Sequence, residues 1–237
     1  MSEHTIKAFD VDLQEISRKV AEMGGLAEKQ IADSIVALSR RDVMLAQRVI
    51  AADPTIDALQ REIEEKAILT IARRQPMAVD LRDIVGALRV SNDLERIGDL
   101  AKNIGKRVVA LNGEFRPAQV IRGVEHMTDL VLAQLKRVLD AYARRDVAMA
   151  MEVWRGDEEI DAVNNSLFRE LLTYMMEDPR NISYCIHLLF CAKNIERMGD
   201  HATNIAETVY YMVEGHALAE ERPKGDTTAV THVPFRN

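Results

Sequence analysis

Apolar residues recur every three or four positions along roughly the first forty residues of the chain. This spacing is typical of one face of an α-helix, and it predicts a helix over about 9–39. Gly24 and Gly25 interrupt the row and mark either a bend or a close contact with another helix. The residues of the row are Leu13, Ile16, Val20, Met23, Ala27, Ile31, Ile35 and Leu38.

Two further helices are expected before the middle of the chain. Asp42 has the residue type of a helix N-cap, and Asp53-Pro54 predicts that the helix ends and restarts there. Pro76 interrupts the chain, and a third apolar-periodic segment covers about 79–111. Because the connection at Pro76 is short, we expect the second and third helices to lie antiparallel.

The same sequence pattern then occurs a second time. The segment 40–43, Arg-Arg-Asp-Val, reappears at 144–147, which is 104 residues later. The segment 95–99, Glu-Arg-Ile-Gly-Asp, reappears as Glu-Arg-Met-Gly-Asp at 196–200, which is 101 residues later. Self-similarity of this length indicates a duplicated unit. We therefore predict an all-α protein made of two tandem three-helix bundles, with six helices in all.

The repeat also gives the expected domain boundaries. The first three-helix unit is predicted over 1–114 and the second over 115–218. Residues 219–237 are polar, contain two prolines and show no apolar period, so we expect a disordered tail there.

Composition narrows the class of protein. Hydrophobic residues make up 47% of the chain and aromatic residues only 5%, which favours a helical protein with a real core. The net charge of −7 argues against nucleic acid as a partner. No apolar run is long enough to span a bilayer and no signal peptide is visible, so we expect a cytoplasmic location. Cys185 and Cys191 match no disulfide or zinc spacing and are expected to be reduced, in or near the core.

Carboxylates four residues apart occur in both units. Residues at this spacing share a helix face, and like charges there destabilise the helix unless a cation offsets them. In an antiparallel hairpin, residues equidistant from the turn lie opposite each other, so each hairpin brings two pairs together. The expected opposite residues are Asp53 with Asp99, Asp57 with Glu95, Asp157 with Asp200, and Asp161 with Glu196.

Two interpretations of these carboxylates remain open. Four neighbouring carboxylates repel one another strongly without cations, and hard metal ions bound through oxygen would neutralise them. Asn103 and Asn204, one turn beyond Asp99 and Asp200, would add amide oxygens. The other interpretation is a solvated helix face paired with nearby arginines and lysines. Because the pairs are duplicated and mirrored about two turns, we favour metal binding, with iron, zinc, manganese or magnesium.

Other residues give weaker signals. Gly98 and Gly199 are costly inside a helix, and their expected role is to let a neighbouring helix approach. His201 follows Asp200, but its counterpart in the first unit is Leu100, so the two sites would differ if it were a ligand. His126 and His187 are lone helical histidines and are expected to be structural or surface residues. The chain shows no phosphate-binding loop, Ser–His–Asp order or cysteine nucleophile setting, and we assign no catalytic residue.

Several segments of the chain resemble the PhoU family of phosphate-transport accessory and regulatory proteins. The resemblance covers about 9–215 and implies two three-helix repeats with multinuclear metal sites, often iron or zinc, at the acid-x-x-x-Asp motifs. All four motifs are intact in this chain. The segments that carry the resemblance are Met23-Gly24-Gly25, Arg74-Gln75-Pro76, Leu94 to Asp99, Leu172 to Asp178 and Phe190 to Asp200.

The resemblance implies a regulator rather than an enzyme. PhoU-like proteins help to repress the phosphate regulon and restrain phosphate uptake. They do so by connecting the high-affinity phosphate ABC transporter with the sensor histidine kinase of a two-component system. They are cytoplasmic, commonly homodimeric, and meet the membrane only through these partners. The alternative is a carboxylate-bridged metalloenzyme, a di-metal hydrolase or oxidase, for which the sequence supplies carboxylates but no evident base or nucleophile.

Overall fold

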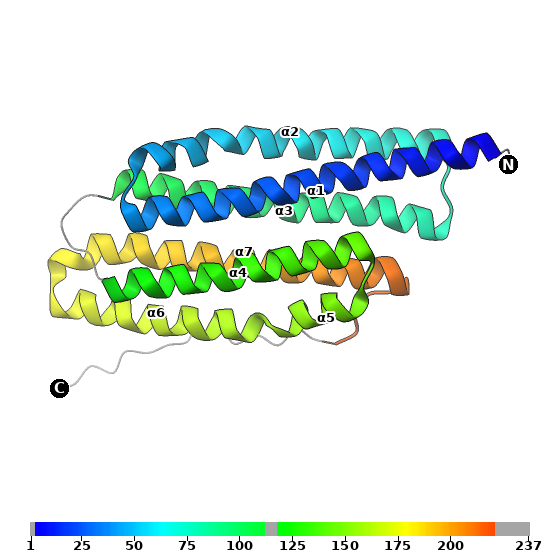
Figure 1. Cartoon of the computed structure of the whole chain (residues 1–237). Helices are drawn as coiled ribbons and strands as arrows, with labels where there is room; N and C mark the ends of the chain where they lie inside the picture. Colours follow the sequence, from blue (N-terminus) through cyan, green and yellow to red (C-terminus); the bar gives the residue numbers. More distant parts are fainter. Residues whose placement is uncertain (1–2, 112–117, 221–237) are drawn as a thin grey trace.

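Two bundles of helices lie against each other with their long axes nearly parallel (Figure 1). The computed structural model describes residues 3–111 and 118–220, and within these ranges it contains helices and short connections but no strand. The predicted all-α fold of two three-helix units is confirmed, with the fifth helix divided in two. The elements are α1 (Glu3–Arg40), α2 (Val43–Arg74), α3 (Ala78–Ala110), α4 (Ala118–Arg144), α5 (Val147–Arg155), α6 (Asp157–Glu177), the 3-10 turn η1 (Pro179–Asn181) and α7 (Ile182–Glu214).

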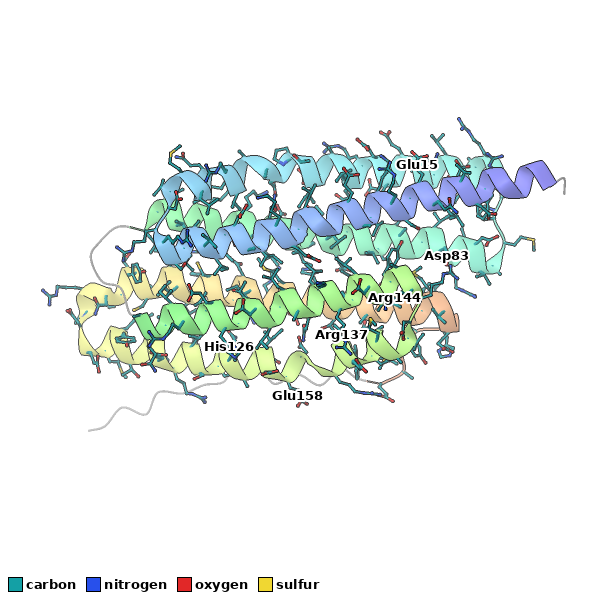
Figure 2. The ribbon with its side chains drawn as sticks, viewed as in Figure 1. Glu15, Asp83, His126, Arg137, Arg144 and Glu158 are labelled. Atoms are coloured by element: carbon teal, nitrogen blue, oxygen red, sulfur yellow. The ribbon has the colours of Figure 1, made fainter. Side chains whose placement is uncertain are left out.

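The third helix of each unit forms the centre of the molecule. In Figure 1, α3 and α7 lie in the adjoining layers of the two bundles, and the two helices pack on each other, as do α1 and α4. The buried apolar side chains form one continuous cluster that runs through both units. An ion pair between Arg145 and Asp83, which is labelled in Figure 2, also joins the second unit to α3.

The turn from the first to the second helix is the same in both units. Arg41 and Arg145 both have a φ of 55°, and each ends a helix in the left-handed conformation. The carboxylates of Asp42 and Asp146 then accept hydrogen bonds from the backbone N–H of Leu45 (2.9 Å) and of Met149 (3.0 Å). The predicted N-cap at Asp42 is therefore confirmed, and the duplication extends to the geometry of its turn.

The predicted helix restart at Asp53-Pro54 is wrong. The helix α2 continues through Pro54, because Ile56 and the following apolar residues pack into the core and hold the chain helical despite one missing N–H. In the second unit the break does occur: α5 ends at Gly156 and α6 begins at Asp157, beside the labelled Glu158 in Figure 2. Neither Asp53 nor Asp157 is an N-cap, since Asp53 lies within α2 and Asp157 is the first residue of α6.

Glycines allow the helices to approach closely at the positions expected from the sequence. A Cβ atom at Gly24 would lie 2.7 Å from Leu139 of α4, so this glycine marks a contact with another helix, and α1 itself is uninterrupted. A Cβ atom at Gly98 would lie 3.0 Å from Ile56 Cδ1, and one at Gly199 would lie 3.1 Å from Ile160 Cδ1. The latter two glycines thus sit at the same helix contact in both units.

Parts of the predicted domain organisation lie outside the described residues. The boundary between 114 and 115 falls in the segment 112–117, and most of the predicted tail falls in 221–237. These boundaries stay predictions. Among the helices that are described, none is long and apolar enough to cross a membrane.

Candidate cation sites on the two helix hairpins

The first carboxylate cluster lies between α2 and α3 and contains a lysine. Lys102 Nζ lies 2.6 Å from Asp53 Oδ2 and also donates a hydrogen bond to Asp99 Oδ1. The ammonium group therefore bridges the two helices at the level where the hairpin register places Asp53 opposite Asp99. Asp53 is buried, with 6% of its surface exposed, and burying a carboxylate without such a partner would be costly.

The carboxylates of this cluster repel one another electrostatically. Burial raises the pKa of Glu95, and the nearby charges of Asp99, Asp57 and Asp53 raise it further, against the opposing effect of Arg96. Arg96 Nε lies 3.4 Å from Glu95 Oε2, and its Nη1 lies 3.8 Å from Asp99 Oδ2. The four carboxylates are thus close enough to interact, as the mirrored spacing predicts, and basic side chains neutralise part of their charge.

The second cluster, between α6 and α7, is more deeply buried. The exposed fractions of Asp157, Asp161 and Glu196 are only 3%, 3% and 5%. A Cβ atom at Gly199 would lie 3.6 Å from Asp157 Oδ1, which places this carboxylate against α7 at the residue that precedes Asp200. Here the basic neighbour is Lys193, whose Nζ lies 2.9 Å from Glu196 Oε2.

The two asparagines do not behave alike. Asn204 donates a hydrogen bond to Asp93 of α3 (3.4 Å), and His201 Nδ1 lies 2.8 Å from the same carboxylate oxygen. Both side chains therefore face the other unit, because α7 packs on α3 along this side. Asn103 is half-buried on α3. Sequence reasoning missed Asp93, because its partners lie more than 100 residues away in another unit.

The chemistry of the clusters fits a hard cation, although the side chains are not arranged around one. In the part of the chain that the structure describes, no three His, Cys, Asp or Glu side chains converge so as to hold a metal ion. The space between Asp53 and Asp99 is filled by the Lys102 ammonium, which is itself a cation among carboxylate oxygens. A metal ion would need this lysine to move away. The ten predicted metal ligands therefore stay a prediction.

The cysteines do not contribute a reactive group to these sites. Cys185 and Cys191 are free and buried, as the sequence predicts. Burial raises the pKa of the Cys191 thiol to about 12, so this thiol stays protonated at neutral pH. His187 is half-buried, and burial lowers its pKa. The two cysteines and His187 are therefore packing residues of the helical interior in this structure.

The fold defines the class of protein: two three-helix units, each with a cluster of carboxylates on the hairpin of its second and third helices. The family model "PhoU domain" matches residues 20–108 and 124–209, once in each unit. The chain belongs to the PhoU family.

Curated relatives match this chain over nearly its whole length. A protein of Rhizobium meliloti (strain 1021) named "Phosphate-specific transport system accessory protein PhoU homolog" is 58% identical, covering 95% of this chain and 95% of that protein. A protein of Caulobacter vibrioides (strain NA1000 / CB15N) with the same name is 54% identical, covering 95% and 98%.

Solved structures show the same fold. The crystal structure of PhoU from Pseudomonas aeruginosa matches with a TM-score of 0.84 and 40% identity, covering 88% of this chain and 100% of that one. The phosphate transport system regulatory protein PhoU from Streptococcus pneumoniae matches with a TM-score of 0.83 and 26% identity, covering 90% and 100%.

Proposed function

We propose that this protein is a non-catalytic regulator of phosphate transport and of the phosphate regulon. It connects the ATPase subunit of the high-affinity phosphate ABC transporter with the sensor histidine kinase of the phosphate two-component system. In phosphate-rich conditions this connection keeps the starvation genes repressed and restrains uptake. The protein acts in the cytoplasm as a homodimer and reaches the membrane only through these partners.

One observation carries this proposal. Relatives that match 95% of this chain at 58% and 54% identity are named accessory proteins of a phosphate-specific transport system. The proposal also includes metal binding at the carboxylate clusters. Multinuclear metal centres bound there would replace the lysine ammonium groups and hold the two helices of each hairpin together. Carboxylate oxygens are the preferred ligands of hard cations, and metal that binds only the folded state stabilises it. In this proposal metal shapes the protein and takes no part in a reaction.

Deleting the gene tests the regulatory role. We expect phosphate-starvation genes to stay expressed in phosphate-rich medium, and the wild-type gene to restore repression. Normal repression in a clean deletion that has no redundant paralogue would contradict the proposal.

The partners are tested by pull-down of the full chain from native membranes of phosphate-rich and phosphate-starved cells. We expect the transporter ATPase and the sensor kinase among the captured proteins. Capture of neither under both conditions would contradict the adaptor role. Light scattering of the purified protein measures its mass, for which we expect twice the chain mass of 26.7 kDa.

The second candidate is a metalloenzyme, a di-metal hydrolase or oxidase. The observation that favours it is the burial of Asp157, Asp161 and Glu196, because a dry carboxylate site suits metal chemistry. Hydrolysis of phosphate esters or consumption of dioxygen by metal-loaded protein, lost when these carboxylates are changed, would establish it in place of the adaptor.

A further inference from the structure

A buried glutamine on the first helix lacks hydrogen-bond partners. Gln30 lies on α1 next to the fully buried Ile31 and is itself only 5% exposed. Among the residues that the structure describes, neither its Oε1 nor its Nε2 has a hydrogen-bond partner. Buried side-chain amides are nearly always hydrogen-bonded, so a glutamine with both atoms unpaired calls for an explanation.

The second unit has a glutamine at the equivalent position. Gln134 follows Gln30 by 104 residues, which is the offset of this part of the repeat, and it lies on α4. Its Oε1 is also buried, without a partner in the described part of the chain. An unpaired amide that occurs in both units is better explained by a shared role than by an accident of packing in one of them.

Each glutamine lines a hollow between the first and second helices of its unit. The hollow of Gln30, between α1 and α2, has a volume of about 490 Å³, and that of Gln134, between α4 and α5, about 650 Å³. Val49 and Ala52 line the first hollow, and their equivalents Val153 and Gly156 line the second. Arg137, at the rim of the second hollow, is labelled in Figure 2. The two hollows are therefore copies of one feature, and a glutamine lines each of them.

The amide group of each glutamine lies beside a glycine that directly precedes a residue of the carboxylate cluster, Gly98 before Asp99 and Gly156 before Asp157. A Cβ atom at Gly98 would lie 3.2 Å from Gln30 Oε1. At the equivalent Gly199, a Cβ atom would lie 3.6 Å from Asp157 Oδ1. These glycines occupy equivalent positions, so the amide oxygen in the first unit and the aspartate carboxylate in the second lie against the same position of the third helix. In the second unit, a Cβ atom at Gly156, which directly precedes Asp157, would lie 3.5 Å from Gln134 Nε2.

We propose that Gln30 and Gln134 are additional ligands of the two cation sites, each contributing its amide oxygen from the first helix of its unit. This inference rests on the proposed binding of metal by the carboxylate clusters. Amide oxygens of glutamine are normal ligands of hard cations. Each site is then built by all three helices of a unit, so that a bound ion fastens the first helix to the hairpin of the other two. An unpaired amide in the metal-free chain is the expected state of such a ligand.

The test uses the full chain with Mn²⁺ as the probe, and electron paramagnetic resonance measures the free ion. The first site is isolated by combining Glu196→Gln with Asp200→Asn. In that background we expect Gln30→Met to weaken Mn²⁺ binding at least tenfold, because a thioether does not replace an oxygen ligand of a hard ion. Without metal, the same variant melts at a higher temperature, because an unpaired buried amide has been removed. Gln14→Met, at an exposed position of α1, is the control and leaves both properties unchanged.

A second variant separates ligation from packing. Gln30→Glu restores an oxygen and adds a charge, so we expect Mn²⁺ binding at least as tight as in the parent and a lower melting temperature without metal. Unchanged Mn²⁺ affinity in Gln30→Met would overturn the role of the glutamine while leaving the carboxylate sites in place. A parent protein that binds no Mn²⁺, iron or zinc would overturn the metal sites themselves, and with them this inference.

Discussion

The two carboxylate clusters share their acidic residues but differ in the lysine that neutralises them. In the first cluster, Lys102 lies one turn after Asp99; the equivalent residue in the second unit is Thr203, which donates a hydrogen bond to Gly199 within its own helix. In the second cluster, Lys193 lies one turn before Glu196, and its equivalent in the first unit is Asn92. The duplication has thus preserved the oxygen atoms and changed the cations. The acidic residues are therefore the part of the cluster that both units share, which is what the proposed metal sites require.

The backbones of the two clusters differ as well. Asp53 lies inside the continuous helix α2, whereas Asp157 begins α6 after the break at Gly156. The free N–H groups at the start of a helix favour a carboxylate there. Asp157 therefore has backbone support for its charge, while Asp53, which is also buried, depends on Lys102. The side chain of Lys102 is 21% exposed and that of Lys193 41%, so the lysine of the second cluster can leave more easily. We expect the second cluster to bind metal more tightly.

The largest effect is expected from removing both clusters. Combining Glu95→Gln, Asp99→Asn, Glu196→Gln and Asp200→Asn keeps side-chain shape but removes four charges, and we expect the purified protein to lose all bound metal. Metal at about 100 times its dissociation constant adds about 2.7 kcal/mol per site, so chelation should lower the melting temperature of the wild type and leave that of the quadruple variant unchanged. Glu95→Gln with Asp99→Asn alone should leave roughly half of the metal. Elemental analysis and melting with and without chelator measure both effects, and equal metal content in all variants would refute the sites.

A single exchange should make the first cluster resemble the second. In Lys102→Thr, Asp53 and Asp99 lose their ammonium partner, and we expect the metal-free protein to lose about 2 kcal/mol of stability. The freed oxygens should then bind Mn²⁺ more tightly than in the wild type. Denaturant unfolding and Mn²⁺ titration test the two halves of this prediction. Lys106→Thr, an exposed position one turn further along α3, is the control, and weaker Mn²⁺ binding by Lys102→Thr would contradict the competition between lysine and metal.

The backbone difference can be reduced by exchanging Pro54. Proline within α2 removes one helical hydrogen bond, and Pro54→Ala restores the missing N–H donor, so we expect a gain in the free energy of unfolding of about 1 kcal/mol. The gain is smaller than the full helix penalty of proline because alanine also frees the unfolded chain. Gly156→Ala in the second unit is the comparison. Its backbone φ of −77° suits alanine, but the Cβ atom would lie 3.3 Å from Glu152 O, so we expect little or no gain. Equal gains in both variants would show that the two helices do not differ in strain.

Much of the fold could be predicted from the sequence, and the failures have local causes. The helices and hairpins, and the position of Asp53 opposite Asp99, were predicted from the apolar period and the repeat, because these features depend on spacing along the chain. The continuity at Pro54 was missed because packing of the apolar residues of α2 overrides the local preference of proline. The break at Gly156 falls at a residue of low helix propensity. The pair of Asp93 and His201 was missed because its two halves lie in different units. Gln30 and Gln134 carried a signal that could have been read, since each is a polar residue at the same place in an apolar row.

The smallest effect concerns the charge of Glu95 without metal. Burial and the neighbouring Asp99 raise the pKa of Glu95, so the folded protein holds this proton more tightly than the unfolded chain does. Stability from this group is therefore fully present below its unfolded pKa, about 4.3, and is lost as the pH rises through the folded value. At pH 7, Glu95→Gln should stabilise chelator-treated protein by less than about 1 kcal/mol, because solvent screens part of the repulsion. The gain should disappear below about pH 4, where Glu95 is protonated in both states.

The same substitution has the opposite sign when metal is bound. An ionised Glu95 is then a ligand, so Glu95→Gln should lower the melting temperature at pH 7 in the presence of Mn²⁺ although it raises it in the presence of chelator. Glu64→Gln, at an exposed position of α2, should change neither value. A salt-bridged surface carboxylate cannot give this reversal, since its contribution does not depend on Mn²⁺. The same sign of change with and without metal would therefore assign the first cluster to ion pairing alone and leave the second cluster as the remaining candidate site.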